Sequence, residues 1–263
     1  MSARSTLAAA ALLLASHSGA VRAQGVEYRT GTTRYHLSTT TKGSQTSPMG
    51  SQDFQIDARQ QLTVNLAKQA KDTLVATVTL DSLSVTSPQG SQDLSHLLGT
   101  KFVTFISPTG KLYSTKPPAG ADAMLAQVTE GVARFLPSYR RDLKAGLTWS
   151  DTTAGKVTQQ GMQVDRTIVA NYKVLGDTTI GDQRAFKVER ISNVKAAGSG
   201  TTQGTPVTLE SATVSNAVFF LSPAGVYLGG HQDDDVNLKI TIVAQGAEIS
   251  IKQKAQSTIE AIK

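Results

Sequence analysis

Apolar and polar residues alternate along two long stretches of the chain. In residues 54–66 the even positions carry Phe54, Ile56, Ala58, Leu62, Val64 and Leu66. In residues 162–174 the even positions carry Met162, Val164, Ile168, Ala170, Tyr172 and Val174. Most of the odd positions between them are polar. Alternation of this length is typical of an antiparallel strand with one buried and one solvated face, so each stretch predicts such a strand.

The next apolar run in each half changes the parity of its apolar positions. The run that ends at Leu80 occupies even positions, whereas Leu83 is odd. In the second half Val188 is even, whereas Ile191 is odd. Because one additional residue reverses the direction of every later side chain, each change predicts a bulge or a sharp bend within a strand.

Two turn sequences of the form Ser-Pro-x-Gly lie one in each half, at residues 107–110 and 222–225. Apolar residues precede and follow both of them. Proline fixes φ at the second position of a turn, and glycine supplies the backbone freedom for leaving it. Each copy therefore predicts a β-hairpin, with a positive φ at Gly110 and Gly225.

One segment has the period of a helix rather than of a strand. Residues 122–135 place Leu125, Val128, Val132 and Phe135 on one stripe at three- and four-residue steps. Asp122 favours the start of a helix, and Pro137 follows its end. Near the C-terminus, residues 238–243 and 247–252 instead predict a hairpin. Residues 42–51 and 196–206, rich in Ser, Thr and Gly, predict loops.

These elements predict a mainly β protein made of two duplicated antiparallel β units, of the curved-sheet or half-barrel type, with one amphipathic helix between them. Phe54 aligns with Met162, Leu80 with Val188, and Gly110 with Gly225. The first repeat, residues 24–143, ends in the helix. The second, residues 144–263, ends in the hairpin.

Residues 1–23 have the three-part pattern of a signal peptide. Arg4 is followed by an apolar run over residues 7–15, and Val21-Arg22-Ala23 precedes the expected cleavage point. The chain contains no cysteine, which excludes disulfides and thiolate metal sites. No second apolar stretch is long enough to span a bilayer. We therefore expect a bacterial protein that is periplasmic or secreted and has no membrane span.

The charge pattern argues against nucleic acid as a partner. The formal net charge is +6, but the basic residues are scattered, and only Arg140, Arg141 and Lys144 lie close together. Basic segments that bind nucleic acid are normally longer and interleaved with aromatic residues.

The order of these motifs resembles a family of uncharacterised, exported bacterial β-rich proteins. The resemblance rests on the first Ser-Pro-x-Gly turn, the helix that closes with Phe135-Leu136-Pro137, a basic run, and residues 146–151, Gly-Leu-Thr-Trp-Ser-Asp. It implies no activity and no functional residues. The plan of a curved antiparallel sheet with a helix against it also resembles, at the level of the fold, the periplasmic lipoprotein-carrier half-barrel.

No catalytic or metal-binding motif is present. His36, His96 and His231 are far apart in sequence, and none has a second histidine at a metal-ligand step. Residues 231–235, His-Gln-Asp-Asp-Asp, offer oxygens for calcium but lack the glycine and the distal glutamate of a calcium loop, so a polar turn is the favoured interpretation. Neither a Gly-x-Ser-x-Gly elbow nor a phosphate-binding glycine loop occurs. We expect no cofactor and no enzymatic activity.

Three functional hypotheses stay open on this sequence. The first is an envelope protein that binds an apolar or lipid-like ligand. The second is a structural or protein-interaction module of the envelope, and the third is a hydrolase with a dispersed site. For the first hypothesis the candidate ligand-binding residues lie on the helix and on two strands that are apolar on both faces. They are Phe102, Phe105, Leu125, Val128, Val132, Phe135, Phe219 and Phe220.

Overall fold

The computed structural model describes residues 25–88, 90–91, 94–118, 120, 123–159, 162–202 and 204–262. The expected signal peptide, residues 1–23, lies outside the described residues. The strands are β1 (Gly31–Ser47), β2 (Gly50–Ala70), β3 (Thr73–Ser87), β4 (Gly90–Ser91), β5 (Lys101–Ile106), β6 (Leu112–Lys116), β7 (Thr148–Gln159), β8 (Met162–Ile180), β9 (Gln183–Thr202), β10 (Thr205–Leu221), β11 (Tyr227–Ile242) and β12 (Ala247–Ile262). The helices are α1 (Ala123–Ala133) and the 3-10 turns η1 (Ser95–Leu97) and η2 (Val243–Gln245).

All twelve strands belong to one antiparallel sheet that does not close on itself. The order is β6-β5-β3-β2-β1-β12-β11-β10-β9-β8-β7, and β4 pairs only with β3. Each half of the chain therefore supplies a run of antiparallel neighbours, and the two runs join where β1 pairs with β12. The prediction of a mainly β protein is confirmed. The duplication of one unit stays a prediction.

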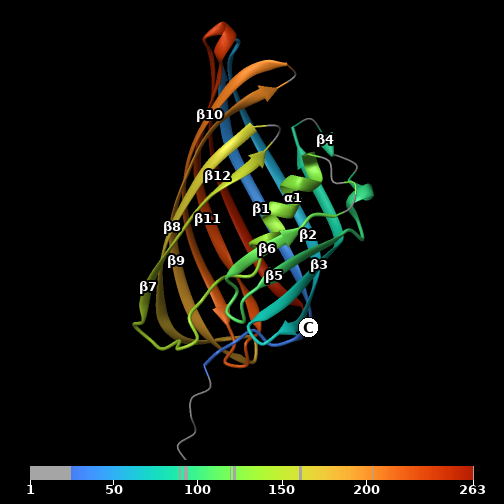
Figure 1. Cartoon of the computed structure of the whole chain (residues 1–263), viewed down its shortest axis with the longest axis vertical. Helices are drawn as coiled ribbons and strands as arrows, with labels where there is room; N and C mark the ends of the chain where they lie inside the picture. The colour runs from blue at the N-terminus through green and yellow to red at the C-terminus, as the bar shows by residue number, and fades with distance from the viewer. Residues whose placement is uncertain are drawn as a thin grey trace, which may run out of the picture.

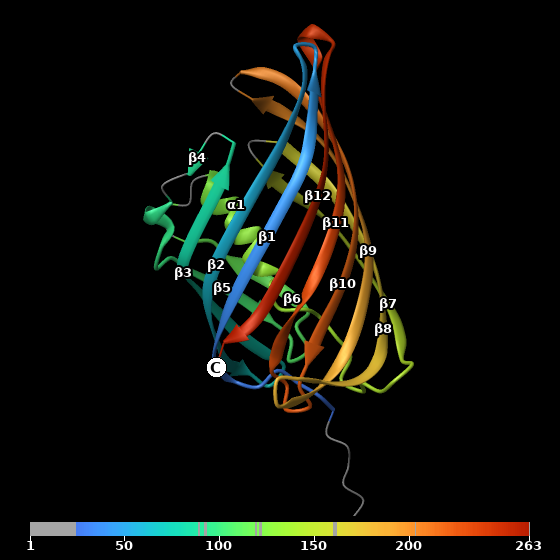
Figure 2. The ribbon, with the colours of Figure 1, turned by 180° about the vertical axis from the view of Figure 1, so that it is seen from behind.

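The sheet curves around α1, which lies on one side of it (Figure 1), whereas the view from behind shows the opposite side of the sheet in front of the helix (Figure 2). We call the side that carries α1 the inner face and the opposite side the outer face. The lower end is the one with the two Ser-Pro-x-Gly turns, and the upper end is the one with the β11–β12 turn. Within the described ranges, none of the helices has the length and apolarity needed to cross a bilayer.

Three segments expected to be turns or loops are strands instead. β1 and β2 occupy most of residues 42–51. β9 and β10 likewise extend into residues 196–206. Residues 231–235 lie in the middle of β11 rather than in a polar turn. Serine, threonine and aspartate are tolerated there because neighbouring strands on both sides satisfy the backbone hydrogen bonds, which local composition does not reveal.

One of the two expected bulges is present. In the β2–β3 ladder Leu62 pairs with Leu80 and Gln61 pairs with Ser82, so Asp81 is the additional residue, as the parity change predicts. The expected irregularity between Val188 and Ile191 is wrong. β9 continues regularly there, and the shift lies instead in β8, where Leu175 is passed over between Val174 and Gly176. Ile191 consequently points to the outer face and is exposed.

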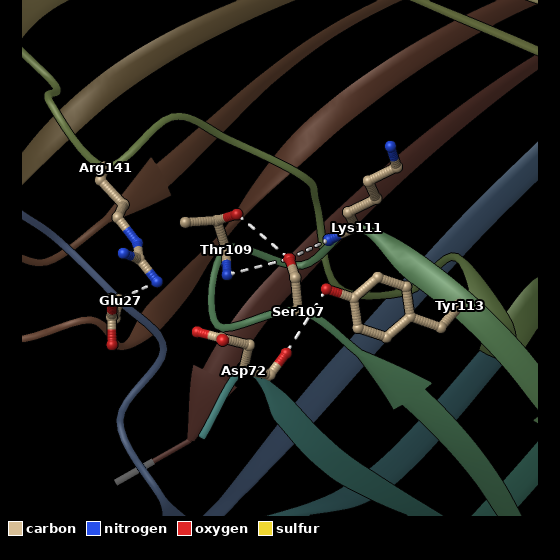
Figure 3. Close-up of polar contacts among 7 residues, drawn as sticks. All are labelled: Glu27, Asp72, Ser107, Thr109, Lys111, Tyr113 and Arg141. Atoms are coloured by element: carbon tan, nitrogen blue, oxygen red, sulfur yellow. Dashed lines mark hydrogen bonds and ion pairs between the residues drawn. The ribbon is translucent and has the colours of Figure 1, made fainter. Parts of the chain in front are cut away.

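The two Ser-Pro-x-Gly turns have the same geometry, and both hairpins are confirmed. Gly110 has φ 84° and Gly225 has φ 78°, both in the left-handed region. The backbone N–H of Gly110 donates to the carbonyl of Ser107 (3.0 Å), and that of Gly225 donates to the carbonyl of Ser222 (2.9 Å). The Ser107 hydroxyl also accepts from the N–H of Lys111 at 2.9 Å (Figure 3).

The N-terminal segment ties these turns together at the lower end. The N–H of Tyr28 donates to the carbonyl of Pro108 (2.7 Å), and the N–H of Arg29 donates to the carbonyl of Gly225 (2.9 Å). Arg141 forms an ion pair with Glu27 at 2.7 Å nearby (Figure 3). A segment from the start of the chain thus closes the lower end of a sheet built from both halves.

A helix, α1, lies within the expected residues 122–135 and against the main core, whereas its amphipathic character stays a prediction. Phe135, just beyond its end, is buried, and Leu125, Val128 and Val132 pack against the buried residues of that core. The core itself is formed at the lower end by both halves of the sheet, for example by Leu62, Leu80, Phe102, Val174, Val188, Phe219 and Leu221.

Candidate functional site

The inner face carries two separate apolar clusters. The lower cluster is the core beneath α1. The upper cluster consists of the buried residues Met162, Val164, Val207 and Leu209, with Leu238, Ile240 and Ile242 packed against them. Both clusters lie on the same face, because Val164 and Tyr172 have the same parity on β8, and Leu209 and Phe219 have the same parity on β10, with no register shift between them.

The described helix residues Leu125, Val128 and Val132 pack against the lower cluster and not against the upper one. The strands that α1 contacts most extensively are β5, β6 and β7, at the two edges of the sheet. Apolar side chains nevertheless continue along the inner face of strands far from those edges. They are only half-buried, and they include Phe54 and Ile56 on β2, Leu238 and Ile240 on β11, and Ile249 and Ile251 on β12.

Small and polar residues predominate on the inner face between the two clusters. We call this zone the belt: Thr39, Ser192, Ser211, Thr213, Ser215, Gln232, Asp234 and Ser257. The pairing places Ser215 between Ser192 on β9 and Asp234 on β11. On the other side of β11, Gln232 lies opposite Ser257, whose hydroxyl is 3.0 Å from that of Thr39. The belt therefore crosses five neighbouring strands.

Arg190 lies at the lower margin of the belt and is held by an amide. A terminal nitrogen of its guanidinium donates to the side-chain oxygen of Gln232 at 2.7 Å. The amide nitrogen of Gln232 donates in turn to both carboxylate oxygens of Asp234, at 2.9 and 2.8 Å. Gln232 thus stands between the cation and the anion, and it orients both.

Two buried polar atoms at this position have no hydrogen-bond partner among the described residues. One is Nε of Arg190 and the other is Oγ of Ser215. Ser215 is only 5% exposed. A buried polar group without a partner costs free energy, so such atoms mark a place where another molecule can supply the missing contact.

The surroundings of Arg190 are aromatic on the lower side. It lies opposite Tyr172 on β8 and opposite the small side chain of Ala217 on β10. Burial raises the pKa of Tyr227, and the positive charge of Arg190 lowers it in part. Burial likewise raises the pKa of Tyr172, and the charge of Arg190 lowers it in part. Both tyrosines therefore stay neutral near pH 7, and they offer Arg190 no negative charge.

The eight predicted ligand-binding residues divide between the two faces. Phe102 and Phe219 are buried on the inner face, and Phe135 contacts the ring of Tyr35 at 4.9 Å between centroids. Leu125, Val128 and Val132 pack against the same lower cluster. Phe105 and Phe220 are displaced from Phe102 and Phe219 by an odd number of residues, so they point to the outer face and are half-buried. The fold brings six of the eight together at the lower cluster.

Sequence reasoning missed Arg190 for an identifiable reason. Val188, Arg190, Ser192 and Val194 share one parity on β9, so a regular strand places the arginine on the inner face. The bulge expected between Val188 and Ile191 would interrupt that parity, so Arg190 was not among the candidate residues. The sequence feature that could have identified it is a charged residue at the same parity as the apolar residues Val188 and Val194, which predicts a charge on the buried face of the strand.

Two cavities among the described residues are lined by side chains outside the belt. A cavity of 340 Å³ lies beside the N-terminal segment and is lined by Tyr28, Tyr35, Leu136 and Tyr227, among others. A larger one, of 810 Å³, includes Phe220, Leu228 and Ile262 together with Ile180 from the β8–β9 hairpin. Neither is lined by Leu125, Val128, Val132 or Phe135.

Histidines and acidic residues do not gather into a metal site in the described ranges. His36 and His231 lie on β1 and β11, on either side of β12, whereas His96 lies in η1. The hydroxyl of Ser107 is engaged with its own turn, where it also lies 3.1 Å from the hydroxyl of Thr109 (Figure 3). In the same view, the Tyr113 hydroxyl donates to the carbonyl of Asp72 at 3.4 Å.

Comparison with known proteins identifies no relative of this chain. No protein-family model matches it, and no curated protein matches it. Among solved structures, it is similar to the crystal structure of Neisserial surface protein A, over 87% of this chain and 98% of that chain, with 8% sequence identity and a TM-score of 0.18. The structure agrees with the β-rich fold that the family resemblance implies. Membership of that family stays a prediction.

Proposed function

We propose that this protein is an exported component of the bacterial cell envelope that binds an elongated apolar or amphiphilic molecule along the upper inner face of its sheet. The observation that carries the proposal is the continuation of apolar side chains beyond the helix. A strand that alternates apolar and polar residues gains stability only where its apolar side meets other apolar matter. On β11 and β12 that alternation continues past the lower cluster through Leu238, Ile240, Ile249 and Ile251, which are half-buried.

The available length suits a long hydrocarbon chain. From Ser215 to Val207, β10 advances by eight residues, or about 27 Å at roughly 3.4 Å per residue. Transfer of each methylene group from water to an apolar surface contributes about 0.8 kcal/mol. A chain lying from the belt to the upper cluster would bury many such groups and would cover the aliphatic side chains around it.

In this proposal the helix limits the site from below. Leu125, Val128 and Val132 are packed against the lower cluster, so the apolar chain would lie above them rather than beneath them. The predicted residues on α1 and on β5 would then stabilise the lower cluster that bounds the site. The residues of β8 to β12 would contact the ligand.

Two neighbouring residues on β10 provide a matched test. Thr213 points to the inner face within the belt, and Val214 points to the outer face, where it is 45% exposed. We would titrate the wild type, Thr213→Trp and Val214→Trp with a fluorescent long-chain alcohol, which is neutral. Saturable binding by the wild type and by Val214→Trp is expected, with affinity lower by at least roughly tenfold for Thr213→Trp because its indole occupies the path of the chain.

Thermal unfolding of both variants serves as the control for folding. Absence of saturable binding by the wild type would contradict the proposal and would favour a structural role. Equal affinity of two folded variants would also contradict it, because the ligand would then lie elsewhere. Native mass spectrometry of the exported protein provides an independent readout, in which a co-purifying amphiphile is expected.

A further inference from the structure

We infer that the ligand carries a single anionic head group of the carboxylate or phosphate type, and that Arg190 binds it at the belt. This inference rests on the proposed function, since it assigns the polar end of the molecule whose chain would lie against the upper cluster. It identifies an anion site that no recognisable sequence motif indicates.

The first argument is the charge of Arg190. It is partly buried, and among the described residues it forms no ion pair. Its hydrogen bond to Gln232 is made to a neutral oxygen, and its buried Nε has no acceptor. A guanidinium removed from water needs a compensating negative charge, and its planar set of donors matches a carboxylate or a phosphate in a two-point contact.

The second argument is that the carboxylate of Asp234 on the inner face is already engaged. Both oxygens of Asp234 accept from the amide of Gln232, so the carboxylate is turned toward Gln232. Gln232 in turn presents its carbonyl oxygen to Arg190. Gln232 is thus a positioning residue, which fixes the guanidinium through a terminal nitrogen, while the buried Nε has no acceptor among the described residues.

The third argument is the set of hydroxyl groups next to Arg190. Ser192 is two residues further along β9 and lies directly opposite Ser215 on β10. Ser215 is a diagonal neighbour of Arg190, at a distance of roughly 7–8 Å between backbones, and its buried hydroxyl has no partner. Opposite Arg190 itself, Ala217 leaves the inner face free of a large side chain. Arg190, Ser192 and Ser215 thus place one guanidinium and two hydroxyl groups beside the small side chain of Ala217 on the inner face.

The position of Arg190 also sets the direction of the ligand. Val188 and Phe219 lie below it and Tyr172 lies opposite it, and all three belong to the packed lower cluster. Above it lie the belt and then the upper cluster. A head group at Arg190 would therefore direct its chain upward, away from α1 and toward the half-buried aliphatic residues.

Paired probes test the inference separately from the proposed function. A fluorescent long-chain fatty acid and the alcohol with the same chain and label would be titrated against the wild type, Arg190→Gln and Lys195→Gln. Lys195 is an exposed cation on the outer face of the same strand, so its variant controls for net charge. The wild type and Lys195→Gln are expected to prefer the acid by on the order of tenfold, whereas Arg190→Gln loses that preference and still binds the alcohol.

The possible outcomes are distinct. Binding of neither probe by the wild type would overturn the proposed function itself. Equal affinity of the wild type for acid and alcohol, or an acid preference that persists in Arg190→Gln, would overturn only the anion site. If Arg190→Gln does not fold, Ser215→Ala replaces it, because that change removes only a buried hydroxyl. A several-fold smaller acid preference in Ser215→Ala would support the site, and an unchanged preference would overturn it.

A phosphate monoester with the same chain forms a third arm of the titration. Preference for the acid would identify a carboxylate head group, and preference for the monoester would identify a phosphate. A preference for a zwitterionic probe over both would overturn the assignment of a single negative charge, because Asp234 would then be a second contact.

Discussion

The lower and upper clusters of the inner face share strands β8 to β11 and the alternation of apolar and polar residues along them, yet they differ in what covers them. The lower cluster lies beneath α1 and Phe135, and both halves of the chain contribute to it. The upper cluster comes from β7 to β11 alone, with β2 and β12 presenting half-buried aliphatic residues at the same level. The same alternation therefore forms a large core beneath the helix at one end, and at the other end a small buried cluster flanked by half-buried aliphatic side chains.

Periodicity therefore determines which face of a strand is apolar, but it does not determine what that face contacts. Packing density and full burial give the lower cluster its contribution to stability. The upper cluster contributes less to the fold, and in the proposed function it contributes to affinity instead.

The largest effect is expected from deleting matched leucine side chains in the two clusters. Leu62 is 1% exposed in the lower cluster, and Leu209 is 8% exposed in the upper one. Leu62→Ala should lower the free energy of unfolding by about 3–5 kcal/mol, because it leaves a cavity in a closed core. Leu209→Ala should cost about 1–2 kcal/mol, because its surroundings can relax. Chemical denaturation measures both, and equal losses would show that the upper cluster is an ordinary core.

The next largest loss of stability is expected from a substitution at the lower end, where the N-terminal segment contacts the second Ser-Pro-x-Gly turn. A Cβ on Gly225 would lie 1.7 Å from the carbonyl oxygen of Glu27, and its φ of 78° disfavours other residues. Gly225→Val should therefore destabilise the protein by about 2–4 kcal/mol. Gly146, with φ 81° and no atom within 4 Å of its Cβ position, is the matched control. Gly146→Val should cost only about 1 kcal/mol, and similar losses at both sites would exclude a role for the contact with Glu27.

Enlarging the helix side chain at the lower cluster tests where the ligand lies. Val128 packs against that cluster, so Val128→Trp should cost about 1–3 kcal/mol of stability through overpacking. Its affinity for the fluorescent alcohol should remain that of the wild type. Loss of binding without loss of stability would place the ligand between the helix and the strands, as the sequence alone suggested.

The smallest effect concerns the charge next to Arg190. Asp234 on the inner face would repel an anionic head group, so Asp234→Asn should raise the affinity for the fatty acid by roughly threefold, a change below about 1 kcal/mol. Asp235 is the control, since it points to the outer face and lies 3.7 Å from Lys254 in an exposed ion pair. Asp235→Asn should leave the affinity unchanged. A weaker affinity of Asp234→Asn for the acid would show that the carboxylate assists binding.

Local patterns were reliable wherever one short segment decides the outcome. The two Ser-Pro-x-Gly hairpins, the helix near residues 122–135 and the bulge at Asp81 all follow from the geometry of a few consecutive residues. The inner-face positions of β2 and β8 follow from their period of two. Composition misled where neighbouring strands supply the backbone partners, as in residues 196–206 and 231–235.

The candidate site shows the same division at the level of single residues. The sequence by itself determined that Phe102, Val128 and Phe219 are apolar and belong to strands or to a helix. Only the tertiary structure decided that they meet in one packed cluster, that β1 pairs with β12, and that Arg190 lies beside Gln232 and Ser215. The physical reason is that periodicity is local, whereas coverage of a face and partners for a buried charge depend on strands that the chain brings together from far apart.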